Sequence, residues 1–237
     1  MGAFCYSLER RWFDTPEYLH TDEQLDVLIS LKEFGRQIER VERDPHSWKF
    51  AITSLSFAVN GALVCFLSGT MQIGALEEKN AKAAIAALQR DCTEGFPKPF
   101  LATPEKLLAR ATGKNKRFDT RDEILEVAEA EKSSFKRLID FRNQLTHFSP
   151  QGWSIELGGL PRLCVDCLSI VNSIRLEGWA FRHLDDLDRD ELEVMLEALS
   201  QQLVAIDKRP FSQGVSITPE CSGTFVGKHA FRTRCKS

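Results

Sequence analysis

Residues 50–76 contain no Asp, Glu, Lys or Arg, and this uncharged stretch constrains the fold more than any other feature of the sequence. It is long enough to cross a bilayer, or it forms a central helix that other helices bury on most sides. A lone lipid-facing helix would carry its polar or helix-weakening residues at a cost: Thr53, Ser54, Ser56, Asn60, Gly61, Ser68, Gly69, Thr70 and Gln72. No second run of this kind and no basic flank would set an orientation, so we expect a buried core helix and no membrane contact.

The composition is that of an ordinary globular protein of 237 residues, with 43% hydrophobic and 27% charged residues. Such a chain can bury a sizeable core, which excludes a disordered tail protein, a collagen-like fibre and a disulfide-stapled miniprotein. The seven cysteines are an odd number and the opening residues show no secretory pattern, so we expect a reduced, cytoplasmic protein. A net charge of −3 argues against a protein that coats nucleic acid, although it leaves room for a local basic site.

Apolar residues recur at helical spacing along most of the chain. After Thr21 they return at three- and four-residue steps, which predicts an amphipathic helix that stops near Pro45. Similar patterns predict helices over 47–67, 77–89, 120–148, 160–179 and 188–206, with a shorter helix around 107–111. No alternation of strands with helices is visible, so the predicted fold class is mainly α, a helical bundle. Residues 153–157 alternate apolar and polar and form either a single short strand or an extended connector.

Three segments of different composition define the expected domain organisation. Residues 1–20 mix aromatic and charged residues without a sustained period, and we interpret them as an N-terminal entry segment. Residues 21–209 carry the helical patterns and form one domain. Residues 210–237 are rich in Ser, Gly and Thr with a basic end, which is typical of a flexible basic tail.

Few segments carry the residue patterns of a metal or cofactor site. Cys164 and Cys167 have the spacing of zinc and redox cysteines, but they fall mid-helix without a partner pair, so we expect buried core residues. No HExxH, GxSxG or GxGxxG motif occurs, and the sequence predicts neither a metal nor a cofactor. The basic loop 114–117 either contacts phosphate or is a solvated turn.

The segment Arg-Asn-Gln-Leu-Thr-His, from Arg142 to His147, is the most informative for chemistry. On a helix, Asn143 and His147 lie about 40° apart on one face, and the long side chain of Arg142 can bend round to join them. His147 closely precedes Pro150, so its ring lies near a helix end that solvent and substrate can reach. An imidazole that moves protons and a guanidinium that holds charge on a phosphorane suit metal-independent RNA cleavage. The alternative is structural: Arg142 pairs with a carboxylate, Asn143 caps a loop and His147 ends a helix.

This segment, late in a long helix of an all-α domain, resembles the signature of the HEPN superfamily, in which an Arg and a usually polar residue precede a His by a few positions. The segment 44–48, Asp-Pro-His-Ser-Trp, also resembles uncharacterised bacterial members. The resemblance implies a helical bundle that dimerises so that two copies of the signature line one cleft. It further implies that His147 is the acid and base, that Arg142 stabilises the phosphorane, and that Asn143 orients one of them or contacts phosphate.

The resemblance therefore implies an endoribonuclease that acts as a homodimer on single-stranded or loop RNA, by attack of a 2′-hydroxyl on the adjacent phosphate. A second interpretation stays open, because many members have lost catalysis and bind RNA, a nucleotide or a partner protein such as a nucleotidyltransferase. Toxin members paired with such a partner often carry a Tyr two residues after the His, where this sequence has Ser149. Regulation through that tyrosine is not expected here.

Overall fold

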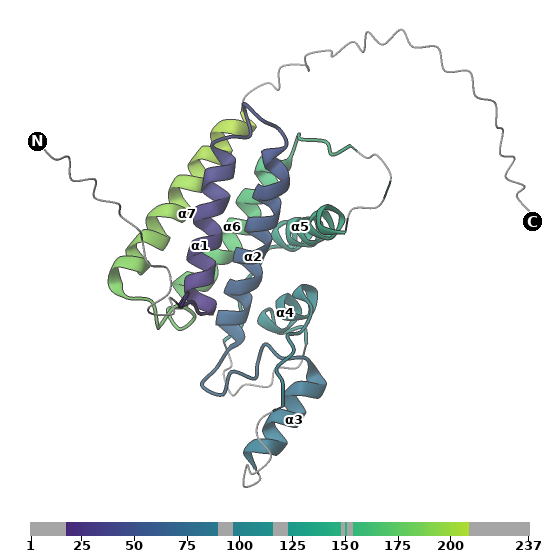
Figure 1. The fold of residues 1–237 in the computed structure, drawn as a ribbon, viewed down its shortest axis with the longest axis vertical. Coiled ribbons are helices and arrows are strands. Elements are labelled where there is room, and N and C mark those ends of the chain that lie inside the picture. Colours follow the sequence, from purple (N-terminus) through teal and green to yellow (C-terminus); the bar gives the residue numbers. More distant parts are fainter. Residues whose placement is uncertain (1–17, 90–96, 116–122, 148–149, 151–153, 209–237) are drawn as a thin grey trace, which may run out of the picture.

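The computed structural model describes residues 18–89, 97–115, 123–147, 150 and 154–208, and in these residues it contains seven α-helices and no strand (Figure 1). The mainly α, bundle-like fold that the sequence predicts is therefore confirmed. Residues 1–17 and 209–237, which include most of the expected entry segment and all of the expected basic tail, lie outside the described residues.

The centre of the bundle is α2 (Ser47–Leu67), which packs against α1 (Glu23–Ile38) and also against α4, α5 and α6. Asp22 starts α1 because its carboxylate accepts hydrogen bonds from the backbone N–H groups of Gln24 and Leu25, at 2.9 and 2.8 Å. The helix ends earlier than the predicted stop near Pro45, because the chain turns at Arg40, whose carbonyl accepts from two later amides. Buried apolar side chains from α1 and α2 form much of one continuous core.

Most of the uncharged stretch forms a buried helix of the bundle. Helix α2 is long and apolar enough to cross a membrane, but 67% of its most apolar window is buried inside the bundle. It is the one helix of this kind among the described residues, and its burial is consistent with a soluble protein.

Two short helices, α3 (Glu78–Leu88) and α4 (Pro104–Ala111), lie near one end of α2 (Figure 1). Helix α4 packs against α2, whereas α3 lies at the far end of the molecule in Figure 1. A single antiparallel bridge between Leu76 and Leu101 ties the two connecting segments together. A small second apolar cluster packs α3 against the segment that carries this bridge. It consists of Ile73, Leu76, Ala81 and Ala84.

The remaining helices are α5 (Glu129–Thr146), α6 (Leu160–Leu176) and α7 (Asp186–Asp207), with α6 packed between α5 and α7. Helix α6 ends before the predicted residue 179, because Gly178 follows it with a positive φ of 70°. The apolar and polar alternation before α6 gives no strand in residues 154–157. These residues form a connector whose Ile155 and Leu157 pack against the core, which explains the alternation.

The predicted start of the long helix over 120–148 is wrong for the residues that the structure describes. Residues 123–128 are not helical, and α5 begins at Glu129. Leu125 is buried and its N–H donates to the carbonyl of Ala111 at 2.8 Å, so this segment is held against α4. The carboxylate of Glu131 then accepts from the N–H of Ala128 at 2.8 Å and starts the helix.

Candidate functional site

The segment from Arg142 to His147 occupies the end of α5. Arg142 and Asn143 lie in its last two turns, and His147 is the residue that caps it, with φ −107° and ψ 63°. The N–H of His147 donates to the carbonyl of Asn143 at 2.9 Å. The predicted position of His147 at a helix end is therefore confirmed.

The bundle holds this end of α5 in place from the side opposite to Asn143 and His147, whereas Arg142 lies toward the packed side. Phe135, Leu138, Ile139 and Leu145 are buried in the core, and α5 packs against both α2 and α6. The hydroxyl of Ser134 donates to the carboxylate of Asp166 on α6 at 2.7 Å, which adds a polar tie between the two helices. The candidate residues thus project from a helix that is anchored along its length.

Asn143 and His147 are exposed, whereas Arg142 is half-buried. The Nε atom of Arg142 is buried without a hydrogen-bond partner. Among the described residues, no hydrogen bond or ion pair involves the side chain of Arg142, Asn143 or His147. The structural alternative, in which Arg142 pairs with a carboxylate, is therefore not seen in this part of the chain, although His147 does end the helix as that alternative expects.

The chemistry available at this helix end comes from a guanidinium and an imidazole, which lie beside helix carbonyls of partial negative charge. A guanidinium presents planar, bidentate donors to phosphate oxygens. The three side chains are not locked to one another: the one hydrogen bond that links two of the residues is between backbone atoms. A ligand would have to bring the Arg142 and His147 side chains together.

Two further polar residues, Lys136 and Asp140, lie on the same exposed face of α5 as Asn143 and His147, because steps of three, four and seven residues keep to one side of a helix. Neither residue was predicted from the sequence, and their spacing from His147 is the signal that identifies them. Lys136 would attract phosphate and Asp140 would repel it. One turn before the site, the Arg137 guanidinium lies 5.8 Å from the ring centroid of Phe141.

The two cysteines with zinc-like spacing are core residues, as predicted. Cys164 and Cys167 are fully buried in α6, and burial raises the pKa of both thiols. A metal requires the thiolate, so this environment disfavours metal binding. In the described part of the chain, no group of three or more His, Cys, Asp or Glu side chains is placed to hold a metal ion.

No family model, curated protein or solved structure matches this chain.

Proposed function

We propose that this protein is a metal-independent endoribonuclease of HEPN type that cuts single-stranded or loop RNA. The observation that supports the proposal best is the state of Arg142: a half-buried guanidinium without a partner among the described residues, next to the exposed Asn143 and His147 at the end of one helix. A buried donor without a partner has a free-energy cost that an anionic ligand would remove. A phosphate group is such a ligand.

In the proposed reaction the ribose 2′-oxygen attacks the neighbouring phosphorus, and the bond from phosphorus to the 5′-oxygen breaks. His147 accepts the proton of the 2′-hydroxyl, and His147 of the partner subunit donates a proton to the leaving 5′-oxygen. Arg142 holds the negative charge that builds up on the phosphorane, and Asn143 contacts phosphate or orients the imidazole. The products are a 2′,3′-cyclic phosphate and a 5′-hydroxyl.

A homodimer is part of the proposal because one imidazole cannot hold both proton positions in the same step. Two copies of α5 that face each other across a two-fold axis would supply the second His147 and the second Arg142, and two-fold dimers are the commonest closed assemblies. Light scattering at micromolar concentration should give the mass of two chains. A monomer under these conditions would contradict the dimeric site.

The chemical test uses RNA substrates that differ at one position. The purified protein should cut an all-ribose oligonucleotide and leave a 2′,3′-cyclic phosphate, which mass spectrometry identifies by its mass. A matched oligonucleotide with a 2′-deoxyribose at the cleaved position should stay intact there, because the nucleophile is missing. Cleavage of both substrates at that position, or a linear phosphate formed without a cyclic intermediate, would contradict the mechanism.

Asp140 and the net charge of −3 favour a second candidate function, a non-catalytic module that binds a partner protein such as a nucleotidyltransferase. The carboxylate of Asp140 shares the exposed face with His147 and would weaken phosphate binding. Asp140→Asn separates the two functions. It should strengthen RNA cleavage if this face binds RNA, whereas a protein that cuts no RNA with either residue would favour the binding module.

A further inference from the structure

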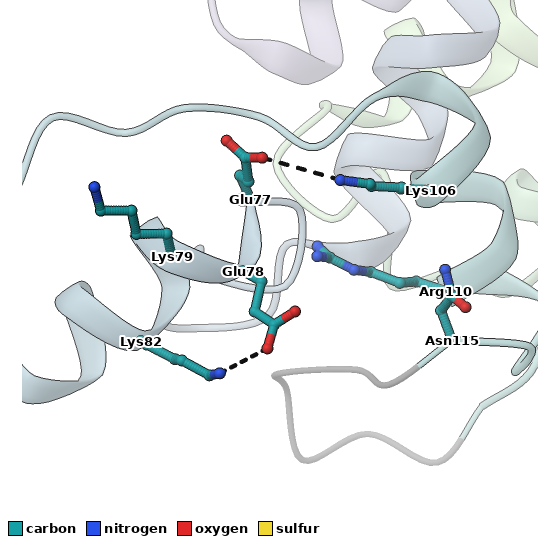
Figure 2. Close-up of a pocket in the computed structure, with 7 residues that line it drawn as sticks. All are labelled: Glu77, Glu78, Lys79, Lys82, Lys106, Arg110 and Asn115. Atoms are coloured by element: carbon teal, nitrogen blue, oxygen red, sulfur yellow. Dashed lines mark hydrogen bonds and ion pairs between the residues drawn. The ribbon is translucent and has the colours of Figure 1, made fainter.

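A cleft of about 660 Å³ between α3 and α4 lies outside the segment proposed to act on RNA, and none of its lining residues belongs to α5 (Figure 2). The described residues that line it carry four cationic side chains, two carboxylates and one amide: Lys79, Lys82, Lys106, Arg110, Glu77, Glu78 and Asn115. The volume is within the range of sites that hold small molecules. A helix over 77–89 and a basic loop at 114–117 were predicted from the sequence, but their proximity was not.

Arg110 forms the floor of this cleft. The residue is only 4% exposed, and its Nη1 atom donates to the carbonyls of Gly74 and Leu76, at 3.0 and 2.6 Å. Figure 2 shows the side chain extending from α4 toward the two glutamates. Burial lowers the pKa of Arg110, and the charges of Glu78 and Glu77 oppose that shift. The two carboxylates therefore offset the charge of a buried guanidinium that is fixed in position.

The lysines of the cleft are held much less firmly. Lys82 pairs with Glu78 at 2.6 Å and Lys106 pairs with Glu77 at 3.9 Å, and all four side chains are more than half exposed. Exposed ion pairs of this kind contribute little free energy, so a ligand can take over the lysines at small cost. Within the described residues, Lys79 makes no ion pair at all. The cleft thus combines three lysines, of which two are in exposed ion pairs, with a guanidinium held by two backbone carbonyls.

We propose that this cleft binds a small ligand that carries two or more phosphate groups. Lys79, Lys82 and Lys106 contact the phosphate oxygens, while Arg110 keeps the floor positive after the lysines leave Glu77 and Glu78. Three separate ammonium groups match a ligand with several anionic groups better than a single phosphate. Asn115 offers an amide to any group attached to that chain. The proposal is independent of the proposed ribonuclease function, because it uses no residue of α5.

The test is calorimetric titration of the full chain in EDTA with inorganic tripolyphosphate and, separately, with ATP. Lys82→Gln/Lys106→Gln removes two charges from the cleft. Lys32→Gln/Lys208→Gln is the matched control, because it removes two charges elsewhere, from α1 and from the end of α7. We expect the cleft variant to bind about tenfold more weakly or worse, and the control to bind like the wild type. Equal melting temperatures of the two variants would show that folding is not the cause.

The two titrants distinguish the sources of the phosphate chain. Binding of both supports recognition of the phosphates themselves, whereas binding of ATP alone supports a nucleotide with further contacts beyond the phosphates. Three outcomes would overturn the proposal: no binding of either titrant at millimolar concentration, equal loss of affinity in the cleft and control variants, or binding of adenosine as strong as that of ATP. In the first of these outcomes, binding of a short RNA would identify the surface as a nucleic-acid contact instead.

Discussion

The backbone N–H of His147 donates to the carbonyl of Asn143 at 2.9 Å, and this bond closes the last turn of α5. It places His147 at the residue where the helix ends. The side chains of both residues are exposed, so the relationship fixes their backbones while it leaves their polar atoms free for a ligand.

Replacing Arg142 by Lys should abolish most RNA cleavage. An ammonium keeps the charge but cannot reproduce the planar fork of donors, and the buried Nε position would lose its group. Cleavage rates of the variant and of Arg36→Lys, an exposed position on α1, give the comparison. Wild-type activity in Arg142→Lys would show that the guanidinium has no role of its own.

Ser134→Ala should lower the free energy of unfolding by about 1 kcal/mol, because it removes the hydroxyl that donates to Asp166 at 2.7 Å. The neighbouring Ser133 is exposed, so Ser133→Ala serves as the control and should change stability by less than about 0.5 kcal/mol. Urea unfolding of the three proteins measures both effects. Equal stability of the two variants would mean that this bond does not tie α5 to α6.

Gly61→Ala should destabilise the bundle by about 1–3 kcal/mol. An added Cβ would lie 2.9 Å from Cγ2 of Val27, where α1 and α2 approach each other, and a β-branched side chain cannot easily move aside. Helix propensity alone predicts the opposite, a gain of roughly 1 kcal/mol from Gly to Ala. A more stable variant in urea unfolding would therefore contradict the close packing of the two helices.

Cys65, Cys164 and Cys167 should resist iodoacetamide in the native protein and react in urea, because their thiols are buried and burial raises the pKa of each. The same shift has a pH dependence. Unfolded thiols ionise at about pH 8.5, whereas the buried thiols stay protonated at that pH. The free energy of unfolding is therefore highest below that pH and decreases above it. Mass spectrometry of the labelled peptides checks the first expectation, and urea midpoints at pH 8 and pH 10 check the second. Rapid native labelling at pH 8 would contradict the burial.

Much of the fold follows from the hydrophobic periodicity, and the exceptions have physical causes. The bounds of α2 are those predicted, because Pro45 precedes the helix, Gly69 follows it, and no charge interrupts it. The start of α5 was not predictable, because Ile124, Val127 and Ala128 continue the helical spacing while Leu125 enters the core in a non-helical segment. That long-range packing leaves no signal in a local pattern.

The two candidate sites also differ in how far the sequence predicts them. Arg142, Asn143 and His147 are close in the sequence, so helical geometry alone was enough to place them at one helix end. The cleft between α3 and α4 depends on Lys79 and Arg110, which come from separate helices joined through the bridge of Leu76 with Leu101. Only the tertiary structure brings those charges together.

The central claim is that His147 moves protons in a metal-independent cleavage of RNA. Its most direct test compares wild type with His147→Ala on labelled RNA in EDTA, with the exposed His183→Ala as the matched control. We predict that wild type and His183→Ala cut the RNA in EDTA and that His147→Ala is slower by about 10²- to 10⁴-fold, with unchanged helix content and oligomeric state. Equal rates for wild type and His147→Ala, or wild-type activity that disappears in EDTA, would contradict the account.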